Sequence, residues 1–363
     1  MKETTLSQEM DSRTTTWGLS CPIDVRRDAP RVTLAHGDGG RLTRQFVREQ
    51  IAIRLGNDYL LPLDDAARLP RPEGPIAVTT DSFVVTPLFF PGGDIGSLAV
   101  YGTVNDLAVA GARPCWLTFS LILEEGLPLP VLDRIIASVA AAAERCGVAV
   151  VAGDTKVVPR GAADGLFINT TGVGVLQPPI PAGPTALADG DELIISGPVG
   201  QHGLAVMAAR ERLSFDPPPK SDSQPIIEPI RVLRDELGSR VKALRDATRG
   251  GVAAVLHEWA EAAGKTLSVE QASFPMTPEL RGMSELLGVD PLYFAGEGVF
   301  LLTVEPGASD AALAVLRQHP ESRLASRVGD VQKQQRFPVI IRRGLGAAQP
   351  LDEPTSALLP RIC

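Results

Sequence analysis

Four aspartates stand beside glycine turns or at the expected ends of strands, where carboxylates can meet a charged ligand. Asp81 closes the run IAVTTD, Asp106 lies in GTVNDLAVAGA, Asp154 closes VAVVAGD and Asp246 lies in ALRDATRGG. One such aspartate alone is more typical of a turn or a helix N-cap. Four together indicate a site for magnesium and a polyphosphate, because magnesium takes oxygen ligands from a few carboxylates and from the phosphates.

A glycine-rich turn at 246–251, Asp-Ala-Thr-Arg-Gly-Gly, is predicted to bind phosphate. Its glycines let the backbone approach an anion, the expected helix behind it points its positive end there, and Arg249 can add charge-assisted hydrogen bonds. Lys156 supplies a further point charge. The absence of GxxxxGK followed by Ser or Thr excludes a Walker-type ATPase, and the glycine run at 197–203 is interpreted as a tight turn with a structural His202.

The chain ends on a thiol, Cys363, behind a segment from about residue 344 that has little hydrophobic periodicity. At about 3.3 Å per residue such a segment reaches on the order of 60 Å when extended, so the thiol can enter a pocket of its own domain or of a partner. A chance cysteine on a disordered tail is the alternative. The other cysteines, Cys21, Cys115 and Cys146, show no CxxC pair and no zinc spacing, which indicates free thiols in a reducing compartment.

Length and composition set the frame for these residues. The chain has 363 residues, of which 44% are hydrophobic and 21% are charged, so two domains with ample cores are expected. A net charge of −8 and the lack of a basic cluster argue against a nucleic-acid partner. The longest uncharged apolar run, 135–143, is too short for a bilayer. We therefore expect a cytoplasmic protein with no membrane segment.

The alternation of helical and strand patterns predicts a mixed α/β (α+β) fold of two αβ domains. The Pro- and Gly-rich segment 177–191 is the best linker. It divides the chain into a disordered leader (1–30), an N-terminal domain (31–180), a C-terminal domain (181–343) and a mobile tail (344–363). Helices are predicted at 42–55, 95–110, 129–146, 202–212, 250–263, 278–287 and 308–318, and strands at 31–34, 76–80, 83–85, 116–123, 148–151, 166–175, 192–196, 266–270, 299–304 and 327–331.

Several motifs together resemble the HypE family of hydrogenase maturation proteins. They are AHGDGG, TTDSFVV, VAGDTKVV, KALRDATRGG and the terminal PRIC, and the resemblance runs from about residue 32 to the end of the chain. The wider superfamily is that of aminoimidazole ribonucleotide synthetase and selenophosphate synthetase. The resemblance implies two αβ domains, a homodimer formed through the N-terminal sheets, and ATP with Mg²⁺ at the junction of the domains.

The resemblance also implies a reaction and partners. The carbamoyltransferase HypF would place a carbamoyl group on the terminal cysteine, and this chain would use ATP to dehydrate the thiocarboxamide to a thiocyanate. The cyano group would then pass to iron held by the HypC–HypD complex, as a ligand of the nickel-iron hydrogenase site. Oxygen is a poor leaving group until it is phosphorylated, which is why the reaction needs ATP.

The residue roles that the resemblance implies fall into three groups. Asp81, Asp106, Asp154 and Asp246 are similar to the family's metal ligands. The nucleotide would be held by Asp38, Asn105, Thr248, Arg249, Gly250 and Gly251, although the HGDGG turn around Asp38 can instead be a lid. Cys363, Glu297 and Lys156 would be catalytic, with Glu297 as the base. The family's usual aspartate before His202 is Gln201 here, and its frequent basic residue is Val299.

Two other functions stay open at this point. One is a noncatalytic thiol carrier, which would have no use for aspartates of the magnesium type. The other is a different ATP-dependent kinase or synthetase of the same superfamily, whose diffusible substrate would need no terminal thiol. Nucleotide binding separates the carrier from the enzymes, and the mass of the tail separates the two enzymes.

Overall fold

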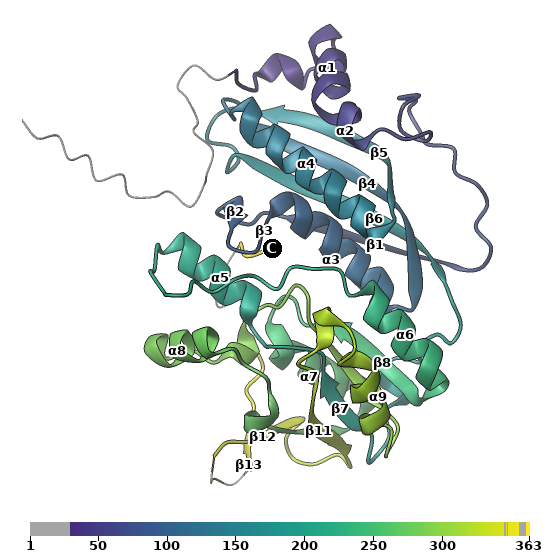
Figure 1. The fold of residues 1–363 in the computed structure, drawn as a ribbon, viewed down its shortest axis with the longest axis vertical. Helices are drawn as coiled ribbons and strands as arrows, with labels where there is room; N and C mark the ends of the chain where they lie inside the picture. The colour runs from purple at the N-terminus through teal and green to yellow at the C-terminus, as the bar shows by residue number, and fades with distance from the viewer. Residues whose placement is uncertain (1–29, 345, 347, 356–360) are drawn as a thin grey trace, which may run out of the picture.

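The structure is a computed structural model that describes residues 30–344, 346, 348–355 and 361–363. Two αβ units follow one another along the chain, and the C-terminus returns to the space between them, near β3 and α5 (Figure 1). Within the described residues, no helix is long and apolar enough to cross a bilayer. Cys21 and the predicted leader lie almost wholly outside the described residues.

The N-terminal unit is built on a four-stranded sheet in the order β1-β6-β4-β5. Its strands are β1 (Ile76–Phe83), β4 (Ala112–Glu124), β5 (Ala149–Val158) and β6 (Leu166–Leu176). Burial alternates along β6 as a half-covered strand requires. The covered face packs against α3 (Ile95–Val109), on which α4 (Leu129–Cys146) also packs. The short β2 (Phe89–Phe90) and β3 (Gly93–Asp94) lead into α3, and Asp94 caps this helix by accepting from the N–H groups of Gly96 and Ser97.

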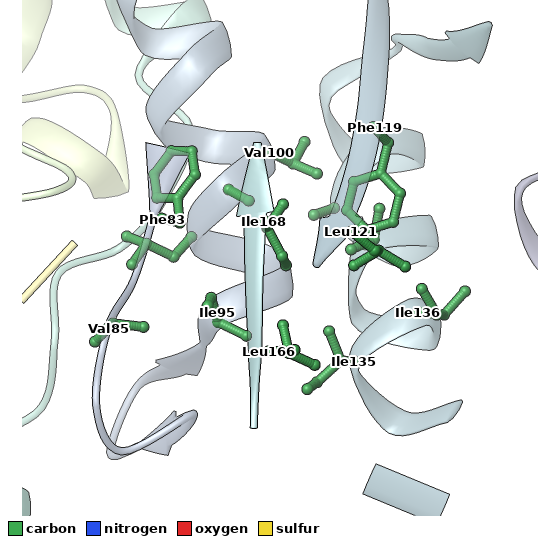
Figure 2. Packing of buried hydrophobic residues seen from close by; sticks show 14 of the residues in the cluster. Phe83, Val85, Ile95, Val100, Phe119, Leu121, Ile135, Ile136, Leu166 and Ile168 are labelled. Carbon is green, nitrogen blue, oxygen red and sulfur yellow. The ribbon is translucent and has the colours of Figure 1, made fainter. Parts of the chain in front are cut away.

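The core of this unit is formed where β4, β6, α3 and α4 meet. Phe119 and Leu121 of β4, Ile168 of β6, Ile95 of α3 and Ile135 of α4 interdigitate there, all with 4% or less of their surface exposed (Figure 2). Because α3 is buried along nearly its whole length, it also contacts α6 and β8 of the second unit. The helix therefore fixes one unit against the other, and its polar residue Asp106 lies at the junction.

The opposite face of this sheet displays apolar and small polar side chains. Val78 and Ile122 are exposed by 60% and 43%, and a row of hydroxyl and amide groups crosses the strands between them, with Thr171 Oγ1 donating to Thr80 Oγ1 at 3.1 Å. We call this surface the open sheet face. Beside β5 lie the helical segments α1 (Arg41–Phe46), η2 (Val47–Ala52) and α2 (Ile53–Leu55), which form one run where the sequence predicted a helix at 42–55.

The C-terminal unit is a seven-stranded sheet in the order β13-β12-β9-β11-β7-β10-β8, with helices on both faces. On β7 (Glu192–Ile195), Leu193 and Ile195 pack with α7 (Gly251–Ala263), whereas Ile194 packs with α6 (Ile227–Leu237) and α9 (Ser309–Leu316). This two-sided burial explains why the strand is a continuous apolar run. The other elements are β8 (Val241–Asp246), β9 (Thr266–Glu270), β10 (Phe300–Val304), β11 (Ser326–Gln332), β12 (Val339–Arg342), β13 (Ala348–Pro350), α5 (Gln201–Arg210) and α8 (Pro278–Leu287).

Several elements differ from the sequence prediction. β1 runs unbroken through Asp81, and Asp154 lies within β5 instead of at its end, so neither carboxylate terminates a strand. The predicted strand at 31–34 is a single bridge followed by the 3₁₀ turn η1 (Leu34–His36). The sequence prediction had no element for α6, β8 or β12. Residues 348–350, which the sequence placed in the tail, form β13 and pair with β12.

Candidate active site at the domain junction

Three of the four predicted aspartates meet at the junction of the two units. Asp81 comes from β1, Asp106 from α3 and Asp246 from the end of β8, and we call these three the acid cluster. Burial raises the pKa of each carboxyl. The neighbouring Asp106 adds to the effect on Asp246, whose pKa reaches about 7. Buried like charges of this kind favour a cationic ligand, which would relieve their repulsion.

The predicted phosphate turn adjoins the acid cluster. Arg249 Nη2 lies 3.6 Å from Asp81 Oδ1, and its side chain is 75% exposed, so it is available to a ligand. The turn closes when the Gly251 N–H donates to the Thr248 carbonyl at 2.9 Å, and α7 begins there. Gly250 and Gly251 both have positive φ, and a Cβ on Gly251 would lie 2.5 Å from the Leu292 carbonyl. Only glycine fits these positions without strain.

Glu297 is the buried carboxylate of the junction. It is 3% exposed, and its Oε1 has no hydrogen-bond partner among the described residues. Burial raises its pKa well above the ordinary value, and the nearby Asp246 and Asp222 raise it further. A raised pKa makes the ionised carboxylate a stronger base, and the unpartnered Oε1 is available to accept a proton.

The terminal thiol lies beside this carboxylate. Burial raises the pKa of Cys363 to about 12, with Glu297 as the next contribution and Arg249 acting in the opposite direction. The Val84 N–H donates to the Cys363 carbonyl oxygen at 3.1 Å, and Arg361 pairs with Asp164 at 2.5 Å. The sequence left open whether the tail points inward or outward. In this structure its tip points inward.

Asp222 is a site residue that the sequence analysis missed. Its side chain is half-buried, and its carboxylate accepts from the backbone N–H groups of Glu297 at 3.1 Å and Gly298 at 3.2 Å. Burial raises its pKa to about 6, against the lowering effect of these bonds. Asp222 follows the run DPPPKS, which is typical of an exposed loop. No periodic signal marks it, and only its place beside the Glu297 loop reveals its role.

A second group of predicted residues lies elsewhere, along β5. Asp38, Asp154 and Lys156 line a cavity of about 510 Å³ between the N-terminal helical segments and this strand, and we call it the β5 cavity. Lys156 Nζ lies 3.1 Å from Asp154 Oδ1, and both side chains are more than half exposed.

Strand order keeps the β5 cavity apart from the acid cluster. Asp81 pairs with Thr170, Thr170 with Phe119, and Phe119 with Gly153, so three strand spacings separate β1 from β5. This is a separation of about 14 Å. The implied pairing of Lys156 with Glu297 is therefore not formed within one chain, and Asp154 does not join the other three aspartates.

Asn105 makes contacts different from those that the sequence analysis expected. Its Nδ2 donates to the carbonyl oxygens of Gln224 at 3.0 Å and Glu297 at 3.3 Å, and its Oδ1 accepts from the Ile226 N–H at 2.9 Å. The side chain thus ties α3 to the segment before α6 and to the Glu297 loop. Its donors and acceptor are used by the protein, which suits a brace between the units better than a nucleotide contact.

The described residues contain no group of three or more His, Cys, Asp or Glu side chains arranged to hold a metal ion by themselves. The acid cluster fits a magnesium ion in another way. Magnesium commonly keeps several waters and is bound by one or two carboxylates together with phosphates. Burial raises the pKa of Asp81, Asp106 and Asp246 in spite of the nearby Arg245, so a further cation would favour their ionised form.

Comparison with known proteins agrees with this architecture. The N-terminal domain of AIR synthase related protein matches residues 63–176, and the C-terminal domain of the same family matches residues 188–342. The carbamoyl dehydratase HypE of Cupriavidus necator is 41% identical over 97% of this chain and 100% of its own length.

Solved structures of HypE proteins also match this chain over most of its length. A crystal structure of the hydrogenase maturation protein HypE in complex with ATP has a TM-score of 0.86 and 41% identity, over 91% of this chain and 99% of that one. A chain of a HypE–HypF complex has a TM-score of 0.75 and 42% identity, over 87% and 100% of the two chains. The chain therefore belongs to the AIR synthase related proteins and, among them, to the family of the HypE carbamoyl dehydratases.

Proposed function

We propose that this protein is an ATP-dependent carbamoyl dehydratase that acts on its own C-terminal cysteine. The observation that carries the proposal is the position of Cys363, whose thiol lies beside the buried Glu297 and near Arg249 and the acid cluster. A nucleophile or carrier thiol, a base and a phosphate-type turn are thus gathered at one junction. The relatives named carbamoyl dehydratase support the same activity.

The proposed reaction removes an amide oxygen from a carbamoyl group on the Cys363 sulfur. The carbamoyl oxygen attacks the γ-phosphorus of ATP, and ADP leaves. The carbon–oxygen bond then breaks, phosphate departs with the oxygen, and the nitrogen loses both protons to leave S–C≡N. In sum the thiocarboxamide loses one water while ATP becomes ADP and phosphate. Glu297 Oε1, which has no described partner, is the base for the nitrogen protons.

ATP and Mg²⁺ have candidate positions on this chain. Arg249 and the 248–251 turn suit the phosphates, and the β5 cavity, at about 510 Å³, has room for a nucleotide. A related structure contains ATP, which supports nucleotide binding here. Magnesium would be held by the acid cluster together with the phosphates, where it would neutralise the charge that develops during phosphoryl transfer.

A homodimer would join the two groups of site residues. The open sheet face presents Val78 and Ile122 to solvent, as an interface core requires. A two-fold axis parallel to the strands would set β5 of one copy over β1 of the other, because such an axis reverses the strand order. The β5 cavity and Lys156 of a second copy would then lie over the junction of the first, so that a nucleotide bound by one copy could reach the thiol of the other.

The proposed partners supply and receive the group on sulfur. A structure of a related HypE–HypF complex supports HypF as the carbamoyl donor. The HypC–HypD complex, with its iron, would accept the cyano group for the nickel-iron hydrogenase. Both transfers require the Cys363 tip to leave the junction, so the inward tail is one of two positions. We place these steps in the cytoplasm, where the thiol stays reduced.

This function is tested by measuring the mass of the C-terminal peptide after the reaction. The full chain is carbamoylated on Cys363, magnesium and ATP are added, and the peptide 352–363 is released by cleavage before Asp352. Loss of one water from that peptide, with one phosphate formed per tail, is the expected result. An unchanged carbamoyl mass despite bound ATP would overturn the enzyme and favour a carrier. Phosphate released without any tail reaction would favour another kinase or synthetase.

A further inference from the structure

We propose that His202 and Ser221 form a latch that docks the C-terminal tail, and that the adjacent Asp222 holds the loop of Glu297 against it. One short segment would then set the thiol and the base relative to each other. The inference rests on the proposed function for its purpose. The position of the tail can nevertheless be tested independently of the reaction, because it is measured without ATP.

The first arm of this latch is a hydrogen bond from a fully buried histidine to the tail. His202 has no exposed surface, and its Nε2 lies 2.5 Å from the carbonyl oxygen of Ile362, the residue before the terminal cysteine. A carbonyl oxygen only accepts, so Nε2 carries the hydrogen and donates it. The Phe90 ring packs edge-on against the imidazole at 5.3 Å between centroids, which helps to hold the ring.

Ser221 sets the tautomer of this histidine. Its Oγ lies 2.8 Å from His202 Nδ1 and accepts from the Ser223 N–H at 3.0 Å. The hydroxyl hydrogen is therefore free to be donated to Nδ1, which leaves Nε2 protonated toward the tail. Burial lowers the pKa of His202 to about 4, so the ring is neutral near pH 7 and this chain of donors persists. A hydroxyl, an imidazole and the tail carbonyl form one ordered series.

The second arm begins at the next residue. Asp222 accepts from the N–H groups of Glu297 and Gly298 and so fixes the backbone from which the candidate base projects. Gln224, two residues further on, accepts from Asn105 on α3. The segment 221–224 also contacts the first unit through the Ser221 N–H, which donates to the Pro91 carbonyl at 2.8 Å. Hydrogen bonds at Ser221 and Gln224 therefore hold this segment against the first unit. The same segment contacts both His202 and the Glu297 loop.

The buried latch has a larger expected effect on docking than the ion pair of the tail. Arg361 and Asp164 are exposed by 39% and 50%, and ion pairs at such exposure contribute little in water. The bond from His202 is fully desolvated, and leaving either partner unpaired would cost the desolvation of that group. Two further bonds hold the docked tail, from the Val84 N–H to the Cys363 carbonyl and from the Arg210 guanidinium to the Arg361 carbonyl. His202, with Ser221 behind it, makes the fully buried side-chain contact, and we assign the selection of the inward tail to these two positioning residues, which do not touch the reacting atoms.

The experiment measures the alkylation of Cys363 by iodoacetamide in the full, uncarbamoylated protein, followed by the mass of peptide 352–363. His202→Asn is too short to reach the Ile362 carbonyl, and we expect its alkylation to be about fivefold to tenfold faster than in the wild type. His202→Gln places an amide N–H where Nε2 lies, and we expect a rate near that of the wild type. Ser221→Ala should fall between them.

Two variants keep this result apart from a general loss of structure. His257 is also buried and also meets a backbone carbonyl, that of Leu351 at 2.9 Å, but it lies away from the tail tip. His257→Asn should leave the alkylation rate unchanged. Asp222→Asn should slow the single-turnover loss of water, because it loosens the Glu297 loop, and should raise the alkylation rate less than His202→Asn does, because Asp222 contacts only the backbone of His202. Circular dichroism and thermal melts select variants that remain folded.

The outcomes separate the latch from the function. Equal alkylation of wild type, His202→Asn and His202→Gln would overturn the latch, even if the wild type dehydrates its tail. Faster alkylation in His257→Asn than in His202→Asn would overturn it as well. If the wild-type tail never loses water, the proposed function fails. Selective exposure of Cys363 in His202→Asn, with rescue by His202→Gln, would still establish the latch.

Discussion

The domain junction and the β5 cavity hold the same kinds of residue in opposite physical conditions. At the junction, Asp246 is 5% exposed and its pKa is raised to about 7 by burial and by Asp106. In the cavity, the Asp154 side chain is 60% exposed and pairs with Lys156 at 3.1 Å. Burial thus produces a site that responds to charge and protons, whereas the solvated pair lies open to a ligand in the cavity.

This difference suggests a division of work. The junction holds the thiol, the base and the acid cluster, so variants there should stop chemistry. The β5 cavity is roomy and open to water, so variants there should change nucleotide affinity. The predictions below test whether the two regions can be separated in this way.

The largest expected effect is that of removing the thiol. Cys363→Ala should abolish loss of water and cyanide transfer completely, because no sulfur remains to carry the carbamoyl group. ATP affinity, measured by calorimetric titration, should stay within about twofold of the wild type, since a neutral thiol makes no charge-assisted hydrogen bond to phosphate. An equal loss of ATP binding in this variant would show that the tail is a structural part of the nucleotide site and would join the two regions.

The next effect concerns the base. Glu297→Gln keeps the shape of the side chain but cannot take a proton, and general-base catalysis typically contributes a factor of about 10² to 10⁴. We expect single-turnover loss of water to slow by that factor while the nucleotide titration is unchanged. Glu270→Gln is the matched control, because Glu270 is a partly exposed partner of Arg342 in the same domain. A slow Glu297→Gln variant that also binds ATP poorly would place Glu297 in nucleotide binding.

Much of the fold was predictable because its signals are local. α4 and α8 begin and end where the sequence predicted, since α4 starts after Pro128 and ends at Gly147 in the left-handed conformation. β9 also matches the prediction. α6 was missed because Pro229 stands in its first turn behind a proline-rich run, a pattern that resembles a loop although a first-turn proline removes no helical bond.

The site was predictable where chemistry marks the residues and was not where only position does. Asp81, Asp106 and Asp246 were expected to meet, and the structure brings them together. Asp154 looked equivalent in sequence, yet it lies on the other edge strand, because strand order is a long-range property. Asp222 and the contact of His202 with the tail were missed for the same reason, since each depends on segments far apart in the chain.

A smaller effect is expected from pH on the tail side of the junction. Burial lowers the pKa of His202 to about 4, whereas an unfolded histidine keeps a value of about 6.5. Below pH 6.5 the histidine is protonated in the unfolded chain but stays neutral in the folded chain. The contribution of His202 to the free energy of unfolding is therefore fully present above pH 6.5 and is lost as the pH falls toward 4. By pH 5 the loss is about 2 kcal/mol.

Urea unfolding at pH 7 and pH 5 measures this loss. His202→Gln cannot titrate, so its free energy of unfolding should fall less than that of the wild type between the two values. The buried carboxyls with raised pKa change stability in the opposite direction, but they are common to both proteins and cancel in the difference. An identical fall in the two proteins would mean that His202 takes up its proton in the folded state, with the latch open.

The smallest effect tests the comparison most directly. Lys156→Ala removes an exposed positive charge from the β5 cavity, and we expect ATP affinity to fall by about tenfold, the effect of one charge-assisted hydrogen bond to phosphate. The rate of Cys363 alkylation should not change, because strand order separates β5, which carries Lys156, from β1, which carries Asp81, by about 14 Å. Arg113→Ala, an exposed change on neighbouring β4, is the control.

Should Lys156→Ala instead slow the loss of water with ATP affinity intact, Lys156 would act at the Cys363 thiol. Within one chain that distance forbids contact, so the lysine would have to come from a second copy across the open sheet face. Mixed dimers of Lys156→Ala and Cys363→Ala chains separate the cases. If Lys156 and Cys363 act on each other across the interface, one site of the mixed dimer joins the intact lysine of the Cys363→Ala chain to the intact thiol of the Lys156→Ala chain, and the other site lacks both. Activity regained on mixing would therefore establish a shared site, and the two regions would be halves of one centre.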